Sequence, residues 1–482
     1  MGQHGLRIVS IMMAITWLSG CVVYLNPQCD DQIANGDETG LDCGGPCGKC
    51  DIGEHCRVNA DCAESTCEGG TCTPLQCANN VRDGDETDID CGGVMCRKCA
   101  GGKTCVDAAD CFNNNCVVAT STCFSLSSVS FADEVAYESG EKTYAIFSGD
   151  FDGDRDIDLV AANEQASNVS VFINEGAGTF QKLPSQFATG DYPTGGTAVD
   201  INKDGLLDVI TADYHGDSVS VLLGMGAGSF RTKATYPTIA GAETSNLAVG
   251  DVNGDSILDI VATNPSASSA SLFLGNADGT LKSGVDIAVG VAGSGAPFSA
   301  AIGDFNGDGR NDLAVANMGD RTIGLRLGNG DGTFQDEISY PEGGLPAYIM
   351  VAADMNLDGK LDLVIANRGS DDVSVLLSRG DGTFRKPVVS STGKMTGPYS
   401  VAIADFNQDS VPDVVTANFM ASSISILIGN GDGHFGAPID GGRTGMVSYG
   451  VIANDLNGDL KPDVATANAS SNSVSVKINT SN

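Results

Sequence analysis

Residues 304–312 read DFNGDGRND, and they follow the pattern D-x-[DN]-x-D-x-x-x-D, which occurs seven times in this chain. The seven copies begin at Asp150, Asp200, Asp251, Asp304, Asp354, Asp405 and Asp455. Their starting positions lie 50 to 53 residues apart. A period this regular indicates one structural unit that is repeated along the chain, and it decides the fold.

Each nonapeptide carries oxygen ligands for a cation. The side chains at positions 1, 3, 5 and 9 and the backbone carbonyl at position 7 converge if the chain curls tightly. Hard cations take about six to eight oxygens, and a flexible oxygen cage suits Ca²⁺ better than Mg²⁺. We therefore expect up to seven Ca²⁺ ions. The predicted ligands, with position 7 contributing its carbonyl, are Asp150, Asp152, Asp154, Asp156, Asp158; Asp200, Asn202, Asp204, Leu206, Asp208; Asp251, Asn253, Asp255, Ile257, Asp259; Asp304, Asn306, Asp308, Arg310, Asp312; Asp354, Asn356, Asp358, Lys360, Asp362; Asp405, Asn407, Asp409, Val411, Asp413; and Asp455, Asn457, Asp459, Lys461, Asp463.

Two alternatives compete with this assignment. An EF-hand needs an acidic residue at position 12 and flanking helices, but position 12 here is Ala, Thr, Val or Ile, and β-like residues follow. A solvated acidic turn without metal is the second alternative, because Asp and Asn favour turns. Four oxygen side chains kept in phase seven times favour the metal. Position 6 favours Gly for a left-handed bend, and the sites without Gly there are weaker predictions: Arg155, Ser256, Ser410 and Leu460.

The residues around each nonapeptide predict four short strands. An alternating stretch such as SVAIAD (400–405) leads into the loop, and a second strand follows it and ends in Ala-Asn or a close variant. A third strand reads like SVSVLLG, and a turn such as GNGDGTF opens the fourth; Asp-Gly and Asn-Gly turns are strong hairpin signals. Four strands repeated seven times predict an all-β fold, a seven-bladed β-propeller. Position 2 of every loop is apolar and is expected to be a buried anchor: Phe151, Ile201, Val252, Phe305, Met355, Phe406 and Leu456.

The whole segment 124–482 resembles the FG-GAP/VCBS repeat family, whose propeller also forms the head of integrin α subunits. The resemblance rests on the loop pattern, on the GDGTF-type turn and on a literal FGAP at residues 435–438. It implies Ca²⁺ in the loop between the first two strands of each blade, on one face of the disc.

The ring is expected to close through the start of this segment. The seventh unit stops after its third strand, at SVSVKINTSN. Its missing fourth strand is expected near residues 127–137, because SSVSFADEVAYESG precedes the first loop much as GDGTFRKPVVSSTG precedes the sixth. Pairing of this strand beside residues 472–479 would remove two open sheet edges.

Residues 1–20 predict a lipoprotein signal peptide. The apolar core IVSIMMAITWL is too short to span a bilayer, and LSGC at residues 18–21 resembles the lipobox of bacterial lipoproteins. The resemblance implies cleavage before Cys21 and a lipid on its thiol, with residues 21–28 as the lipidated cysteine and a linker. Val22 favours the outer membrane of a Gram-negative bacterium. An ordinary secretory signal with a chance cysteine is the alternative.

Residues 29–123 hold all the cysteines except Cys21, in two similar modules at 29–73 and 74–123. An exported chain meets an oxidising compartment, and small modules with poor cores use disulfides as staples. We therefore expect disulfide-rich modules that resemble repeats of bacterial surface lipoproteins and act as a stiff stalk. Zinc is the alternative, because a C-x-x-C spacing occurs at Cys47/Cys50 and Cys96/Cys99.

Ligand recognition is expected on the face opposite the metal loops. Its connecting loops vary most between repeats, and variable loops on a rigid scaffold usually carry binding. Candidates for exposed ligand contacts are Tyr214, His215, Arg368, Phe419 and Met420. A further set stands six residues before each first aspartate and either rings the mouth of the channel or packs between blades: Tyr144, Thr194, Ser245, Phe298, Tyr348, Tyr399 and Tyr449.

Composition disfavours nucleic-acid binding and catalysis. The net charge is −36, whereas nucleic acids attract Lys and Arg. Catalysis needs a base or nucleophile with a positioned partner, but the propeller has only His215 and His434, in different repeats, and no catalytic motif. We therefore expect a non-enzymatic, calcium-binding surface lipoprotein that acts in adhesion or binds a glycan or protein ligand. The alternatives are a structural surface protein without a specific ligand and a propeller-based, polysaccharide-active enzyme.

Overall fold

The structure is a computed structural model, and it describes residues 65–68, 71–74, 98–99, 101–106, 108–111, 116–117, 121–123, 129–291, 293–344 and 346–481. Contacts divide the chain into two units, Met1–Lys98 and Cys99–Asn482. Over the described residues the chain forms β-strands and two 3-10 helices, Ala108–Asp110 (η3) and Pro265–Ala267 (η4). No helix in this part of the chain is long and apolar enough to cross a membrane.

Short elements precede the propeller. In the first unit, β1 (Ser65–Glu68) pairs antiparallel with β2 (Thr71–Pro74). In the second unit, disulfides join Cys105 to Cys116 and Cys111 to Cys123, and the same segment holds the paired strands β3 (Cys116–Val117) and β4 (Thr122–Cys123). These bridges support the predicted disulfide-rich modules. The predicted signal peptide, Cys21 and most of the cysteines lie outside the described residues.

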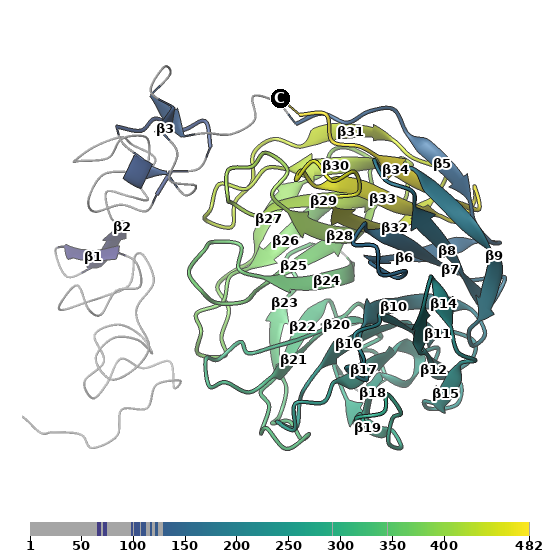
Figure 1. Cartoon of the computed structure of the whole chain (residues 1–482). Coiled ribbons are helices and arrows are strands. Elements are labelled where there is room, and N and C mark those ends of the chain that lie inside the picture. The colour runs from purple at the N-terminus through teal and green to yellow at the C-terminus, as the bar shows by residue number, and fades with distance from the viewer. Residues whose placement is uncertain are drawn as a thin grey trace, which may run out of the picture. The chain divides into compact units, whose positions relative to one another are not determined.

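Seven four-stranded antiparallel sheets form the blades of a propeller (Figure 1), which confirms the predicted fold. The inner strand of each blade precedes the acidic nonapeptide, called the metal loop here for its predicted ligands, and the second strand begins at position 9 of this loop. In chain order the blades are β6 (Thr143–Gly149), β7 (Asp158–Asn163), β8 (Asn168–Asn174) and β9 (Phe180–Ala188); β10 (Pro193–Val199), β11 (Asp208–Asp213), β12 (Ser218–Leu222) and β15 (Ala234–Pro237); β16 (Asn246–Gly250), β17 (Asp259–Asn264), β18 (Ser269–Phe273) and β19 (Val285–Ala288); β20 (Pro297–Gly303), β21 (Asp312–Asn317), β22 (Thr322–Arg326) and β23 (Ile338–Pro341); β24 (Ala347–Ala353), β25 (Asp362–Asn367), β26 (Asp372–Leu376) and β27 (Val388–Ser391); β28 (Pro398–Ala404), β29 (Asp413–Asn418), β30 (Ser423–Leu427) and β31 (Ile439–Arg443); and β32 (Ser448–Asn454), β33 (Asp463–Asn468), β34 (Ser473–Lys477) and β5 (Val135–Glu138). A minor pair, β13 (Gly224–Gly226) and β14 (Ser229–Phe230), lies in the second blade.

The second strand of every blade is buried along its whole length. Its sequence, such as DLVIAN in β25, is rich in Val, Ile, Leu and Ala rather than alternating. A continuous apolar run is expected where both faces of a sheet are covered. In a propeller each blade is covered by a neighbour on both faces, so this strand has no solvent-facing side.

The core consists of seven hydrophobic clusters among the described residues, and each lies between two adjacent blades. Each cluster contains one position 2 residue of a metal loop. Phe305, for example, packs with Leu363 and Met350 of the next blade. The predicted position 2 anchors are confirmed, since all seven are at most 5% exposed. The metal loops are therefore tied directly to the contacts that hold the blades together.

The ring closes as the sequence predicted. β5 pairs antiparallel with β34, with Tyr137 opposite Val474. An isolated bridge between Phe131 and Asn479 extends the pairing. The first strand of the propeller segment is thus the fourth strand of the last blade, and this leaves no open edge between blades 7 and 1.

The last residue of each second strand is a buried Asn in six blades and Asp213 in the other. Three hydroxyls donate to the Asp213 carboxylate, from Ser220 at 2.6 Å, Thr211 at 2.8 Å and Ser218 at 3.0 Å. Burial nevertheless raises the pKa of Asp213 to about 6. Because this pKa lies above the unfolded value, stability is highest where both states are protonated, below about pH 4, and falls as the pH rises to about 6.

We predict that Asp213→Asn raises stability above pH 6 by up to about 3 kcal/mol, because an amide needs no charge in this buried position. The check is the free energy of urea unfolding at pH 4.5 and pH 7.5 in saturating Ca²⁺. The matched control, Asn264→Asp in the next blade, should add a pH dependence of the same sign. Identical pH profiles for wild type and Asp213→Asn would contradict the assignment.

Candidate metal centres and the opposite face

The seven nonapeptides form equivalent loops on one face of the disc, each between the inner and the second strand of its blade. In the fourth loop, Asp304 follows β20 and Asp312 begins β21. The hairpin turn of the next blade reaches the loop, because the Gly382 N–H donates to the Phe305 carbonyl at 3.2 Å. Loop, blade and neighbouring blade are thus joined by backbone contacts.

The aspartate at position 9 is fully buried in all seven loops. One oxygen of Asp312 accepts the Phe305 N–H at 2.9 Å, and the other accepts the Gly328 N–H at 2.8 Å. The same two bonds occur at Asp158, Asp208, Asp259, Asp362, Asp413 and Asp463. This residue therefore fixes the loop to the turn after the third strand.

The other predicted ligands turn their oxygens toward the inside of the loop. Asp304 accepts the N–H groups of Gly307 at 2.7 Å and Gly309 at 2.8 Å. Asn306 accepts the Asp308 N–H at 2.9 Å, and Asp308 accepts the N–H of position 7 at 2.9 Å. These bonds curl the backbone so that positions 1, 3 and 5 share one side.

Carboxylate oxygens converge most closely in the first loop. Oxygens of Asp150, Asp152 and Asp158 all lie within 4.8 Å of one another. In five other loops the position 3 amide donates to the position 5 carboxylate at 3.0–3.1 Å, as Asn306 does to Asp308. The predicted metal ligands are hard oxygen atoms in every loop, and such a set of ligands fits Ca²⁺.

Electrostatics favour a cation in these loops. Burial, together with the carboxylates at positions 5 and 1 of the same loop, raises the pKa of Asp413 to about 8 and that of Asp362 to about 7. Backbone N–H donors lower these pKa values only in part. An opposite charge beside a carboxylate favours its ionised form, so a divalent cation would offset the cost of burying it.

All seven loops adopt the left-handed conformation at position 6, with or without Gly. The φ angles are 87° at Gly205, 79° at Gly309 and 81° at Gly359. The four residues that replace Gly at position 6 also have positive φ angles: Arg155 (80°), Ser256 (65°), Ser410 (67°) and Leu460 (67°). A side chain there costs roughly 1–2 kcal/mol, and the surrounding bonds hold the bend.

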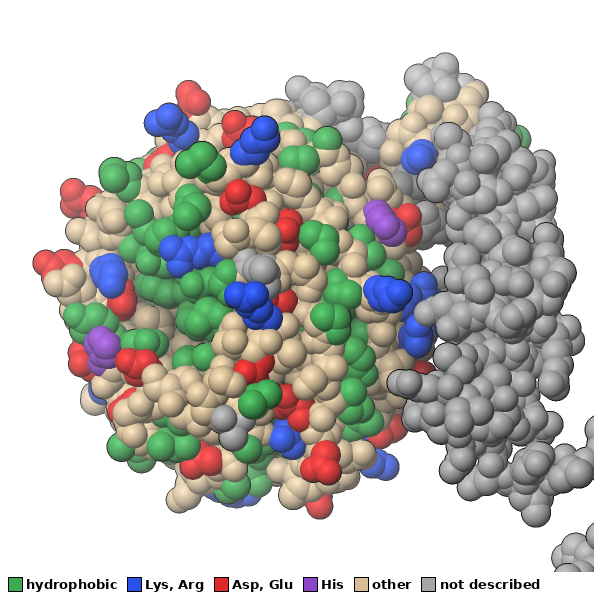
Figure 2. All heavy atoms as spheres, turned by 180° about the vertical axis from the view of Figure 1, so that it is seen from behind, with side chains coloured by type: hydrophobic (Ala, Val, Ile, Leu, Met, Phe, Trp, Pro, Cys, Tyr) green, Lys and Arg blue, Asp and Glu red, His purple; other side chains and the backbone are tan. Residues whose placement is uncertain are grey.

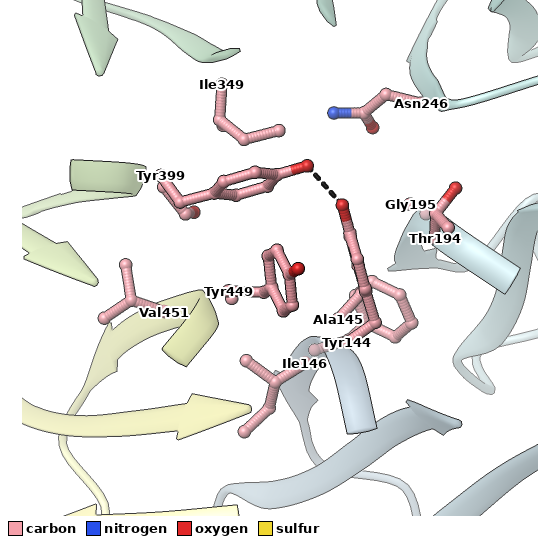
Figure 3. A pocket seen from close by; sticks show the side chains of 14 residues that line it. Tyr144, Ala145, Ile146, Thr194, Gly195, Asn246, Ile349, Tyr399, Tyr449 and Val451 are labelled. Atoms are coloured by element: carbon pink, nitrogen blue, oxygen red, sulfur yellow. Dashed lines mark hydrogen bonds between the residues drawn. The ribbon is translucent and has the colours of Figure 1, made fainter. Parts of the chain in front are cut away.

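Aromatic side chains gather on the opposite face, at the mouth of the channel (Figure 3). Tyr399 is 3% exposed and lies at the centre of the group. Its ring centroid is 4.6 Å from that of Tyr348 and 4.7 Å from that of Tyr449, and Tyr449 stacks on Tyr144 at 4.1 Å. The Tyr144 and Tyr399 hydroxyls share a hydrogen bond. Phe298 also belongs to this aromatic group, because its ring centroid lies 5.0 Å from that of Tyr348.

The predicted ligand contacts form two groups. The Arg368 guanidinium lies 3.8 Å from the Phe419 ring centroid, donates to the Tyr348 hydroxyl at 3.1 Å, and so belongs to the channel group; Met420 beside it is 59% exposed. In the second blade, Tyr214 donates to Glu243 at 2.9 Å, and its ring lies 5.1 Å from that of His215.

Sequence reasoning missed a cavity at the channel mouth. It has a volume of about 170 Å³ and is lined by Tyr144, Thr194, Asn246, Tyr399 and Tyr449, among others. Asn246 carries no pattern that marks it in the sequence. The sequence signal that could have indicated this cavity is the pair of small residues, Thr194 and Ser245, where the five other repeats have an aromatic residue.

These features define a seven-bladed β-propeller with one acidic, oxygen-rich loop in every blade. The chain belongs to the FG-GAP-like repeat family, whose model matches residues 150–211, 200–262, 251–315, 304–365 and 354–416. These matches together span more than half of the chain.

Solved structures share the propeller at low sequence identity. BBS1N in complex with ARL6DN is 13% identical, with a TM-score of 0.50 over 73% of this chain and 96% of that chain. A lectin from Agrocybe aegerita that recognises non-reducing terminal N-acetylglucosamine is 19% identical, with a TM-score of 0.47 over 71% and 97%. Virginiamycin B lyase from Staphylococcus aureus is 12% identical, with a TM-score of 0.48 over 72% and 99%. At this identity only the fold is shared. No curated protein matches the chain.

We predict that Asp405→Ala lowers the number of Ca²⁺ ions bound per chain by about one and destabilises the sixth blade by about 1–3 kcal/mol. The substitution removes an expected ligand, leaves the Ser410 N–H without its acceptor and leaves the Asp409 N–H with Asn407 alone. Calcium content and hydrogen exchange of blade 6 are the measurements. The control Asp432→Ala, in the hairpin turn of the same blade, should leave the calcium content unchanged; equal content in Asp405→Ala and wild type would remove this loop from the metal sites.

Proposed function

We propose that this chain is a calcium-binding surface lipoprotein whose propeller binds a glycan or protein ligand and so acts in adhesion. One observation carries the proposal: the residues at equivalent positions are nearly the same in all blades on one face of the disc and differ between blades on the other. One face repeats the same acidic loop seven times, whereas the equivalent positions on the other face carry different side chains, as at Tyr144, Thr194 and Ser245. Repetition serves a shared structural purpose, and variation on a rigid scaffold serves recognition.

In this proposal Ca²⁺ would be held by the side chains at positions 1, 3, 5 and 9 and the carbonyl at position 7. When bound, it supplies positive charge that neutralises the carboxylates and links the loop oxygens. The protein's own residues carry this rigidity inward. The position 9 aspartate holds two backbone segments, as Asp312 does, and the position 2 side chain, such as Phe305, packs against the next blade.

The opposite face supplies the chemistry for a ligand. The Arg368 guanidinium lies over the Phe419 ring, and Met420, the next residue in the chain, exposes an apolar side chain. Figure 2 shows hydrophobic side chains gathered in a hollow of the propeller, with Lys or Arg side chains at its edge. Aromatic residues, Arg and Met are enriched in binding interfaces, so this face suits recognition better than the acidic one.

The anchor in this proposal is a lipid on Cys21, with residues 29–123 as a stalk and the outer membrane of a Gram-negative bacterium as location. We predict that Cys21→Ala moves the protein from the membrane fraction to the soluble fraction after cell lysis, because a lipid chain supplies the membrane affinity. Detergent phase partition and the mass of the N-terminal peptide are the measurements. Val22→Ala is the matched control and should stay with the membrane; unchanged partition of Cys21→Ala would refute lipidation at this residue.

A binding screen tests the function. The full chain should bind a defined class of glycan or cell-surface protein in Ca²⁺, and binding should fall at least tenfold in EDTA as the loops lose their ion. Arg368→Ala should weaken a ligand that contacts the recognition face, whereas Asp432→Ala on the metal face should not. No binding by folded protein in either condition would leave a purely structural surface role and overturn the proposal.

A further inference from the structure

The cavity exists because two of seven equivalent positions are small. Each position lies in or next to the start of an inner strand, and in five blades an aromatic side chain fills the channel mouth. Blades 2 and 3 carry Thr194 and Ser245 instead. The aromatic group therefore stops short of these blades, and a space of about 170 Å³ remains between it and the start of β10.

One wall of this cavity is aromatic. Tyr144 and Tyr449 stack with their ring planes at 17°, and Tyr399 meets Tyr449 edge to face at 85°. The rings are held by each other and by the Tyr144–Tyr399 hydrogen bond, so their positions are set before a ligand arrives. Such a wall offers flat apolar surface with hydroxyls at its edge.

The rest of the lining is uncharged and combines apolar side chains, such as Ile349, with polar groups. It includes the backbone of Gly195 and Gly196 and the side chains of Thr194 and Asn246. Figure 3 shows the Asn246 amide directed toward the hydroxyls of Tyr144 and Tyr399. The side-chain oxygen Oδ1 of Asn246 accepts the Leu247 N–H at 2.8 Å. Among the described residues the Asn246 N–H₂ group donates no hydrogen bond, so it is available to a ligand. None of the described residues that line the cavity carries a charged side chain.

We propose that this cavity binds one neutral pyranose ring, the terminal sugar of a glycan. This inference rests on the proposed function and names its ligand class and site. A pyranose has an apolar C–H face for the tyrosine wall and hydroxyls for Asn246 and the peptide groups. A purely apolar ring would leave these polar groups unpaired, which is unfavourable. Pockets for drug-sized ligands hold about 300–1,000 Å³, so this smaller space fits a single ring.

The first test variant copies into blade 2 a residue that other blades carry at the equivalent position. Thr194→Tyr places in blade 2 the residue that blades 1, 5, 6 and 7 carry at the equivalent position, and its ring should fill the cavity. Asn246→Ala removes the amide donor and is the second variant if the first does not fold. Met395→Ala, at a residue 76% exposed and outside the lining, is the control.

The probes are the methyl glycosides of glucose, galactose, mannose and N-acetylglucosamine, with methyl glucuronide as the charged comparison. Binding to the full chain in Ca²⁺ is followed by saturation-transfer NMR and by tyrosine fluorescence, since the only Trp is Trp17 in the predicted signal peptide. We expect at least one neutral glycoside to bind and the glucuronide to bind more weakly. Thr194→Tyr and Asn246→Ala should each weaken the neutral sugar at least tenfold, with Met395→Ala unchanged.

Two results would overturn the sugar site, and both leave the proposed function standing. In one, wild type binds a ligand in the surface screen but no neutral glycoside. In the other, Thr194→Tyr and Asn246→Ala bind the glycoside as wild type does, which places the sugar elsewhere. Failure of the proposed function is a separate outcome, in which no ligand of any class binds.

Discussion

The buried aspartate that begins the second strand of each blade joins the acidic loop to the turn after the third strand in all seven blades. At Asp312, one oxygen holds the metal loop through Phe305 and the other holds the turn after the third strand through Gly328. The Phe305 side chain in turn packs against the neighbouring blade. A carboxylate is costly to bury unless it is paired, and burial raises the pKa of Asp312. The proposed Ca²⁺ offsets that cost, and it would do so seven times around the ring, where each ion supports one contact between blades.

The same repetition leaves the opposite face free to vary. The hydrogen bonds and apolar contacts that hold the ring together lie at the metal loops and between the blades. The residues at the starts of the inner strands can therefore differ from blade to blade. Tyr399 can fill the channel mouth while Thr194 leaves it open. The proposed division of roles follows from this geometry: a uniform face that carries stability, and a non-uniform face whose side chains meet a ligand.

Much of the fold was predictable because its signals are local. The nonapeptide, the apolar position 2 and the hairpin turns lie within single repeats, and the missing fourth strand of the last blade was visible at the start of the segment. The left-handed bend at Leu460 was harder to predict, because the bonds around it, rather than its own preference, fix its φ of 67°. The cavity depends on contacts between distant repeats, such as that of Tyr144 with Tyr399, 255 residues apart. The equivalent positions of these tyrosines are visible in the sequence, but their pairwise contacts and the role of Asn246 leave no pattern there.

Anomalous X-ray scattering from crystals grown in Ca²⁺ locates each ion relative to its ligands, so it tests calcium binding by the seven loops directly. We expect a calcium peak within every loop, among the oxygens of positions 1, 3, 5 and 9 and the carbonyl of position 7. Peaks in the three loops with Gly at position 6 and absence from the other four would show that a side chain at position 6 limits binding. Absence of calcium from all seven loops would contradict the account, since the buried aspartates would then be held by backbone N–H groups alone.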